Sequence, residues 1–253
     1  MGKKSKYLAA ALTMAFLSAG CSSKNDENLG GGNPAGTAAG AMGSAIVSGK
    51  AVLNGKAPSP ATIDMGADPT CKAQHSGTVK DDSVVQNANG TLQNVFVYVK
   101  EGAGNYPAPS TPVVLDQKGC MYNPHVLGVQ VGQPLQIVNS DPTLHNVHCM
   151  PAVNDGFNMA QPAQGMKTSK AFAKPEVMVK MKCDVHSWMH CYVGVVSNPF
   201  FGVTGADGTF KITGLPSGTY TLAAWHEKYG TSEKKVEVKD GETKTVDFTF
   251  NAN

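Results

Sequence analysis

Several side chains with metal-binding atoms lie close together in the second half of the chain. The run 182–191 reads KCDVHSWMHC and places Cys183, His186 and Met189 at the spacing Cys-x2-His-x2-Met, followed by His190 and Cys191. A thiolate, an imidazole and a weak thioether are the donors of a trigonal copper site, and copper prefers them to oxygen-rich sites. One short loop brings these three donors to the same ion. A further imidazole must come from another segment.

The segment around His145 supplies that imidazole. The predicted strand Leu135–Val138 is followed by Asn139 and a polar, proline-containing turn, and His145 then begins the next strand. A ligand on a different strand from the Cys loop allows the β-sheets to set the geometry before the metal arrives. Asn146 is expected to hydrogen-bond across to the Cys loop and to stiffen it.

The run LHNVH at 144–148 and the Cys183 loop together resemble the cupredoxin family, and the ligand spacing resembles that of its amicyanin-like members. The resemblance implies one type 1 (blue) copper ion. It assigns His145, Cys183 and His186 as equatorial ligands and Met189 as the weak axial ligand.

The loop departs from the amicyanin-like pattern at two positions. Ser187 stands where those loops usually carry Pro, and Trp188 stands where they usually carry Phe, so a less rigid loop is expected. A binuclear copper site with Cys183 and Cys191 as joint ligands is disfavoured because too many residues separate the two. His190 is expected to face solvent.

The other histidines carry weaker signals. His148 is three residues after His145, and this offset turns it to the opposite face of a strand, so a structural or surface role is expected. His75 follows Cys71 closely, but a single Cys-His pair is weak support for a second metal site. No role is predicted for His125 or His226.

Four cysteines remain for disulfide formation: Cys71, Cys120, Cys149 and Cys191. In an oxidising compartment they allow three pairings. We hypothesise that a Cys149–Cys191 disulfide braces the copper site, because the metal would hold those two loops near each other. Cys71–Cys120 would then be the other disulfide.

Short alternating apolar runs separated by turn residues predict an all-β fold with no convincing amphipathic helix. The run 207–222, DGTFKITGLPSGTYTL, resembles the carboxypeptidase regulatory-like or transthyretin-like β-sandwich family, which implies architecture only. The predicted strands are 46–53, 95–99, 113–115, 126–131, 135–138, 146–149, 169–172, 177–183 and 192–196, followed by a meander of about four strands after Pro199.

These patterns predict a cupredoxin Greek-key sandwich at 92–198 and a smaller transthyretin-like module at 199–253. The segment 45–91 is a β segment whose strand 46–53 resembles the opening strand of that second family. We hypothesise that this strand completes the C-terminal module, since four strands alone would leave open edges. The copper domain would then be an insertion.

The N-terminus reads as an export signal followed by a tether. Residues 1–20 have a basic start, an apolar run too short to cross a membrane, and a small-residue end before Cys21. This end resembles a bacterial lipobox, which implies lipidation of Cys21, although Ser18 departs from the usual Leu. Residues 21–44 are rich in Gly, Ala, Asn and Ser and are predicted to be a flexible linker. The expected location is the cell envelope, facing the periplasm or the exterior.

Composition narrows the function further. All 21 basic side chains are Lys, so the bidentate Arg fork that suits nucleic acid is missing and nucleic-acid binding is not expected. No catalytic arrangement is found, and four protein ligands leave no open position for a substrate, so no enzyme is expected. The predicted function is single-electron transfer between redox partners such as a c-type cytochrome, a dehydrogenase or an oxidase. Copper trafficking or resistance, and a purely structural lipoprotein, remain open alternatives.

An apolar rim around His186 is expected to serve as the docking patch for such brief redox encounters. Its members are Pro142, Leu144, Met150, Pro151 and Trp188.

Overall fold

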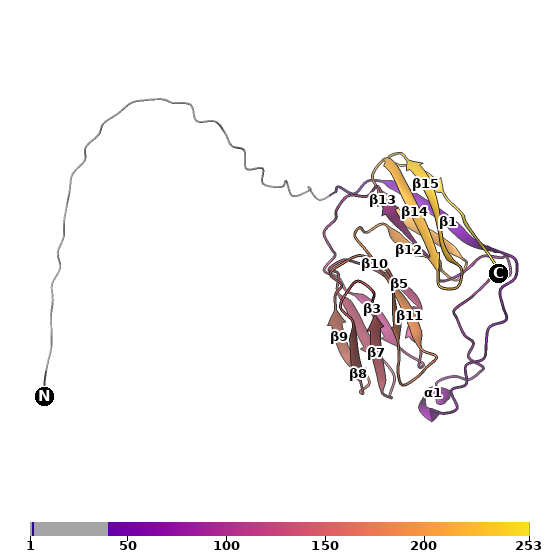
Figure 1. Cartoon of the computed structure of the whole chain (residues 1–253), viewed down its shortest axis with the longest axis vertical. Helices are drawn as coiled ribbons and strands as arrows, with labels where there is room; N and C mark the ends of the chain where they lie inside the picture. Colours follow the sequence, from indigo (N-terminus) through magenta and orange to yellow (C-terminus); the bar gives the residue numbers. More distant parts are fainter. Residues whose placement is uncertain (1, 3–39, 253) are drawn as a thin grey trace. The chain divides into compact units, whose positions relative to one another are not determined.

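The computed structural model describes residue 2 and residues 40–252, and residues 40–252 belong to one compact unit. The predicted signal (1–20), Cys21 and nearly all of the linker (21–44) lie outside the described residues. Strands make up almost all of the regular structure, which confirms the all-β prediction (Figure 1). Within the described part of the chain, no helix is long and apolar enough to span a membrane.

Two sheets that enclose one core form what we call the terminal sandwich. In one sheet, β1 pairs antiparallel with β13 and parallel with β16 and β17, and the other sheet has the order β12-β2-β14-β15. The strands of the terminal sandwich are β1 (Ala45–Asn54), β2 (Phe96–Glu101), β12 (Phe201–Val203), β13 (Thr209–Leu215), β14 (Gly218–His226), β15 (Gly230–Val238), β16 (Thr243–Thr245) and β17 (Phe248–Asn251).

Period-2 alternation explains how β1 joins this core. Val47, Ala51 and Leu53 are buried and share a cluster with Phe248 and Phe250 of β17. Burying one face of β1 against β17 and its neighbours fixes its register, because a one-residue slip would turn every apolar side chain outward. The N-terminal strand therefore packs with the C-terminal segment, as the insertion hypothesis requires.

The strand β2 corrects the predicted boundary at residue 92. It pairs with β12 and β14, so it belongs to the terminal sandwich and not to the domain predicted at 92–198. Val97 and Val99 face the core of the terminal sandwich, while Phe96 on the other face is buried in a separate cluster. A strand buried on both faces has no alternating pattern that would reveal its sheet.

The predicted meander after Pro199 is also corrected. β13 pairs with β1 in one sheet, whereas β14 pairs with β2 and β15 in the other. The connection between Leu215 and Gly218 therefore crosses from one sheet to the other, and strand alternation alone does not distinguish this crossing from a hairpin turn.

The chain between β2 and β12 forms a second sandwich, which we call the inserted sandwich. Its sheets have the orders β5-β11-β10-β7-β8 and β4-β3-β6-β9. Its strands are β3 (Val113–Gln117), β4 (Tyr122–Asn123), β5 (Val126–Gln130), β6 (Leu135–Asn139), β7 (His145–Met150), β8 (Phe157–Gln161), β9 (Lys167–Lys170), β10 (Glu176–Lys182) and β11 (His190–Val196). The strand predicted at 169–172 begins earlier, as β9.

The segment between β1 and β2 is mostly irregular but contains one short helix, α1 (Pro69–Ala73), which the sequence did not predict. The Asp68 side chain caps it by accepting hydrogen bonds from the backbone N–H groups of Thr70 and Cys71. A five-residue helix has little stability of its own, so its contacts with the inserted sandwich hold it in place.

The two sandwiches meet where Phe96 lies against two paired glycines, Gly128 on β5 and Gly194 on β11. A Cβ atom at Gly194 would come within 2.4 Å of the Phe96 ring, and one at Gly128 would come within 2.4 Å of the Phe201 ring. These positions therefore need glycine so that the rings can approach the backbone closely.

We expect Gly194→Ala to lower the free energy of unfolding by about 1–3 kcal/mol, because the buried Phe96 ring must move to admit the methyl group. Denaturant unfolding of the wild-type and variant proteins measures this change. Gly77→Ala is the matched control, since a Cβ atom there meets nothing within 4 Å. Equal stabilities for Gly194→Ala and wild type would show that the two sandwiches do not depend on this contact.

Candidate metal centre

Strand pairing brings the predicted ligands to one rim of the inserted sandwich. β10 runs antiparallel to β7 with Lys182 opposite His148. The end of β10, where Cys183 follows, therefore lies beside the start of β7, where His145 stands. His186 returns toward the same place from the loop between β10 and β11.

The three strong donors converge in the interior. The Nδ1 atoms of His145 and His186 are 3.0 Å apart, and the Cys183 sulfur is 3.8 Å from His186 Nδ1. One donor atom from each of the three lies within 4.8 Å of the others. All three residues are at most 2% exposed. Their two imidazoles and one thiol fit the trigonal copper set by donor chemistry.

Backbone hydrogen bonds close the ligand loop. His186 N–H points at the Cys183 sulfur at 3.4 Å, Met189 N–H donates to the His186 carbonyl, and Cys183 N–H donates to the Met189 carbonyl at 3.0 Å. The Met189 side chain is fully buried in the same core cluster as Cys183. The loop therefore holds its shape through its own backbone, although Ser187 replaces the expected Pro.

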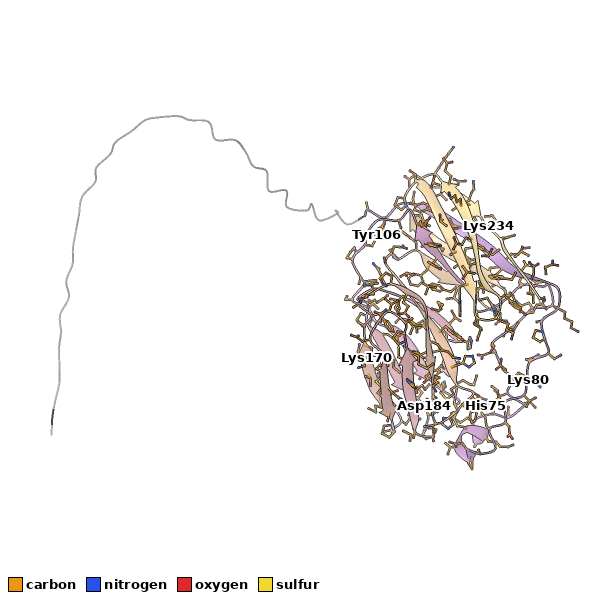
Figure 2. The ribbon with its side chains drawn as sticks, in the orientation of Figure 1. His75, Lys80, Tyr106, Lys170, Asp184 and Lys234 are labelled. Carbon is orange, nitrogen blue, oxygen red and sulfur yellow. A yellow bond between two sulfur atoms is a disulfide. The ribbon has the colours of Figure 1, made fainter. Side chains whose placement is uncertain are left out.

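Asn146 makes the cross-link expected of it. Its side-chain oxygen accepts from the Asp184 N–H, and its amide donates to Asp184 and to Asn158. The side chain of Asp184, labelled in Figure 2, also accepts from His148 Nδ1 at 3.0 Å. His148 thus points away from the three donors and takes the surface role predicted for it.

The outer nitrogens of both ligand rings contact carboxylates that the sequence did not single out. His145 Nε2 is 2.9 Å from Asp141, which is fully buried, and His186 Nε2 is 3.0 Å from Asp68. A carboxylate on the outer nitrogen orients a ligating imidazole and leaves its inner nitrogen free to bind metal. The polar turn before His145 hinted at Asp141, but no sequence signal connected Asp68 to a ligand more than 100 residues away.

Electrostatics favour a thiolate at Cys183. Burial opposes ionisation, but hydrogen bonds with His145 and with nearby backbone amides lower the pKa of Cys183 to about 7. Burial lowers the pKa of His145, but its hydrogen bonds with Asp141 and Cys183 outweigh burial and raise the pKa to about 9. The thiolate is the metal-binding form of cysteine, so this environment prepares Cys183 to be a ligand.

The Cys71–Cys120 disulfide is present, which confirms that predicted pair, and it lies over His186. The Cys71 sulfur is 3.4 Å from His186 Nε2, and Trp188 Nε1–H donates to the Cys120 carbonyl at 2.9 Å. Because Cys71 is in α1, the disulfide fastens this helix over the site. Two other clusters of potential metal ligands contain Cys71 or Cys120, but neither cysteine can supply a thiolate, because the two sulfurs are joined in the disulfide.

This cover encloses the His186 ring itself, while Leu144 and Met150 of the predicted apolar rim remain exposed. Asp68, Cys71 and Trp188 enclose the ring, and His186 is 2% exposed. His75, labelled in Figure 2, helps to hold the cover, since its Nε2 is 2.7 Å from the Gly119 carbonyl. His75 therefore has a structural role, and Cys71 cannot join it as a thiolate ligand because its sulfur is in the disulfide.

The predicted Cys149–Cys191 disulfide is wrong. β10 lies between β7 and β11, and Met181 pairs with Cys149 on one side and with Cys191 on the other. Strands separated by a third strand are about 10 Å apart. Cysteines whose Cα atoms are more than about 7 Å apart cannot be bridged without moving the backbone. Both thiols are free and buried.

His190 does not face solvent as predicted. It lies beside His125 and Glu227, and these three residues form a second group with metal-binding atoms close together. His226 is buried, and its Nδ1 accepts from the Lys228 N–H.

Comparisons with known proteins show what two parts of the chain are similar to. The carboxypeptidase regulatory-like domain family matches residues 198–251, and no curated protein matches the chain. Among solved structures, a Cu(I) mutant of amicyanin is similar with 23% identity, covering 33% of this chain and 81% of that one at a TM-score of 0.30. A purple cupredoxin from Nitrosopumilus maritimus is similar with 20% identity, covering 33% of this chain and 97% of that one at a TM-score of 0.29. A copper-containing nitrite reductase from Thermus scotoductus is similar with 21% identity, covering 39% of this chain and 25% of that one at a TM-score of 0.31.

Proposed function

We propose that this protein is a mononuclear copper protein that carries single electrons in the cell envelope. The observation that carries the proposal is the buried convergence of His145 Nδ1, His186 Nδ1 and the Cys183 sulfur at one point. Met189, fully buried in the same loop, is the weak fourth ligand. Copper bound there supplies a reversible one-electron couple.

The surrounding residues keep the donors in place. Asp141 and Asp68 orient the outer faces of the two imidazoles, and Asn146 ties the Cys loop to β7. Donors held in this way change little when the charge of the ion changes, which favours fast electron exchange. The enclosed donor set leaves no room for a substrate, so we propose electron transfer and not catalysis.

Redox partners would approach through the exposed apolar side chains next to the ligands. Leu144 precedes His145 and is 41% exposed, and Val185 precedes His186 and is 50% exposed. A small apolar patch of this kind suits weak, short-lived encounters. We propose a c-type cytochrome, a dehydrogenase or an oxidase as the partner.

We also propose that a lipid on Cys21 anchors the protein to a membrane of the cell envelope, with residues 21–44 as the tether. The composition of this segment supports a flexible tether. In membrane fractionation, Cys21→Ser should move the protein from the membrane pellet to the soluble fraction. Retention of the variant in the pellet would rule out this anchor.

Addition of copper to the purified mature protein tests the main proposal. We expect one Cu²⁺ per chain, an intense visible absorption band, loss of the band on reduction and its return on reoxidation. The band arises because a thiolate sulfur is a direct ligand. A colourless protein that binds only Cu⁺ would overturn electron transfer and favour copper trafficking. A protein that binds no copper would leave the structural alternative.

A further inference from the structure

A second group of metal-binding side chains lies where the two sandwiches meet. His125 immediately precedes β5, and His190 is the first residue of β11, so both belong to the inserted sandwich. Glu227 follows β14 of the terminal sandwich, and Asp82 comes from the irregular segment between β1 and β2. Three separate parts of the fold thus contribute to one cluster.

Both imidazoles turn their Nε2 atoms toward the same carboxylate. His125 Nε2 contacts Glu227 Oε1, and His190 Nε2 is 3.4 Å from Glu227 Oε2. One donor atom from each of the three lies within 4.8 Å of the others. The Ser83 hydroxyl, 3.4 Å from His190 Nε2, lies on the same inner side. Two nitrogens and one or two oxygens therefore surround a common point.

The outer nitrogens of both rings also have acceptors. His125 Nδ1 is 3.3 Å from Asp82 Oδ1, and His190 Nδ1 is 3.2 Å from the Trp188 carbonyl. A carboxylate or a backbone carbonyl on the outer nitrogen is the arrangement that orients metal-ligating histidines. With a cation bound, this arrangement keeps the proton on Nδ1 and frees the Nε2 lone pair for the ion; without one, each Nε2–H donates to Glu227.

Charge and burial agree with a cation at this point. The side chains of His125 and Glu227 are 4% and 11% exposed. Burial opposes ionisation of Glu227, but hydrogen bonds from His125 and His190 lower its pKa to about 2, so it is a carboxylate. Burial raises the pKa of Asp82, while the neighbouring His125 opposes that rise.

We propose that His125, His190 and Glu227 bind a divalent transition metal of the zinc type, with Asp82 positioning His125 and with Ser83 or water completing the coordination. Imidazole and carboxylate together suit Zn²⁺, which takes four ligands in structural sites. The ion joins the two sandwiches, because Glu227 is on one and both histidines are on the other. The site shares no ligand with the copper centre and does not depend on it.

Zinc binding to the full mature chain, prepared without a polyhistidine tag, tests the proposal. The protein is first loaded with one equivalent of copper, or carries Cys183→Ser so that the first centre does not compete. We expect equilibrium dialysis to find one Zn²⁺ per chain. Glu227→Gln and His125→Asn should each weaken this binding by about 100-fold or more, since loss of even a supporting residue costs 10–100-fold. Failure of the wild type to bind zinc, or equal binding by Glu227→Gln, would overturn the proposal.

Two controls separate metal binding from folding. Glu242→Gln removes a half-buried carboxylate that accepts from the Lys239 N–H and pairs with Lys244, and it should bind zinc as the wild type does. Circular dichroism checks that the site variants fold. If the site variants do not fold, the visible spectrum of the wild type with Co²⁺ added tests the site instead. Visible bands of four-coordinate Co²⁺ without a thiolate charge-transfer band support the site, and a six-coordinate spectrum contradicts it.

Discussion

Replacing Cys183 with Ser is expected to abolish the visible absorption of the copper-loaded protein and to weaken copper binding by about 100-fold or more. Cys183 is the free thiol that lies beside both His145 and His186, and its pKa is lowered to about 7. A serine hydroxyl has nearly the same size but is a hard, weakly acidic donor, so it replaces the packing of the thiol and not its bond to a soft metal.

Cys149→Ser is the matched control for this experiment. Cys149 is also a free buried thiol, on β7, but burial raises its pKa to about 12. Strand β10 separates it from Cys191. We expect Cys149→Ser to keep one copper and the full absorption band. Absorption spectra and copper analysis of the two variants measure the difference. A Cys183→Ser protein that stays blue would show that another sulfur is the ligand.

Removing the Cys71–Cys120 disulfide is expected to lower the free energy of unfolding by about 4 kcal/mol and to expose His186. The disulfide joins residues separated by 49 positions, and a closed loop of this length restricts the unfolded chain by about that amount. In the folded state, α1 would remain attached mainly through the Asp68–His186 and His75–Gly119 contacts. Met65, buried in the core of the inserted sandwich, would also hold this segment, so we expect the cover to loosen and not to detach.

The double variant Cys71→Ser/Cys120→Ser tests both effects. Denaturant unfolding measures the stability, and the rate at which ferricyanide reoxidises the reduced copper protein measures access to His186. We expect reoxidation to become faster than in the wild type. His75→Asn serves as the control, because it removes one contact of the cover and leaves the disulfide intact. Unchanged stability would contradict the stabilising role of the disulfide, and an unchanged rate would show that α1 does not limit electron exchange.

Local sequence patterns predicted the donors of the candidate copper site. Cys183, His186 and Met189 stand close together in one loop, and a loop this short brings its side chains together in almost any β context. His145 was identified because a strand, a polar turn and a second strand precede the Cys loop in the order of a known family. Alternation of period 2 likewise revealed most strands, since it depends only on neighbouring residues.

Tertiary structure alone decided which distant strands are neighbours. β10 lies between β7 and β11, and this order forbids the Cys149–Cys191 disulfide that sequence proximity to the ligands had favoured. The assignment of β2 to the terminal sandwich likewise depends on its partner strands and not on its own residues. Strand order is a property of the whole sheet, so no local pattern encodes it.

The surroundings of the site were also invisible in the sequence. Asp68 reaches His186 because the Cys71–Cys120 disulfide and α1 return to the rim of the inserted sandwich. Glu227 meets His125 because two separate sandwiches pack against each other. The sequence by itself predicted which donors converge, because Cys183, His186 and Met189 are close along the chain and His145 begins a strand that follows a polar turn. The folded structure decided what covers these donors and which other metal-type side chains come together, because those contacts join residues about a hundred positions apart.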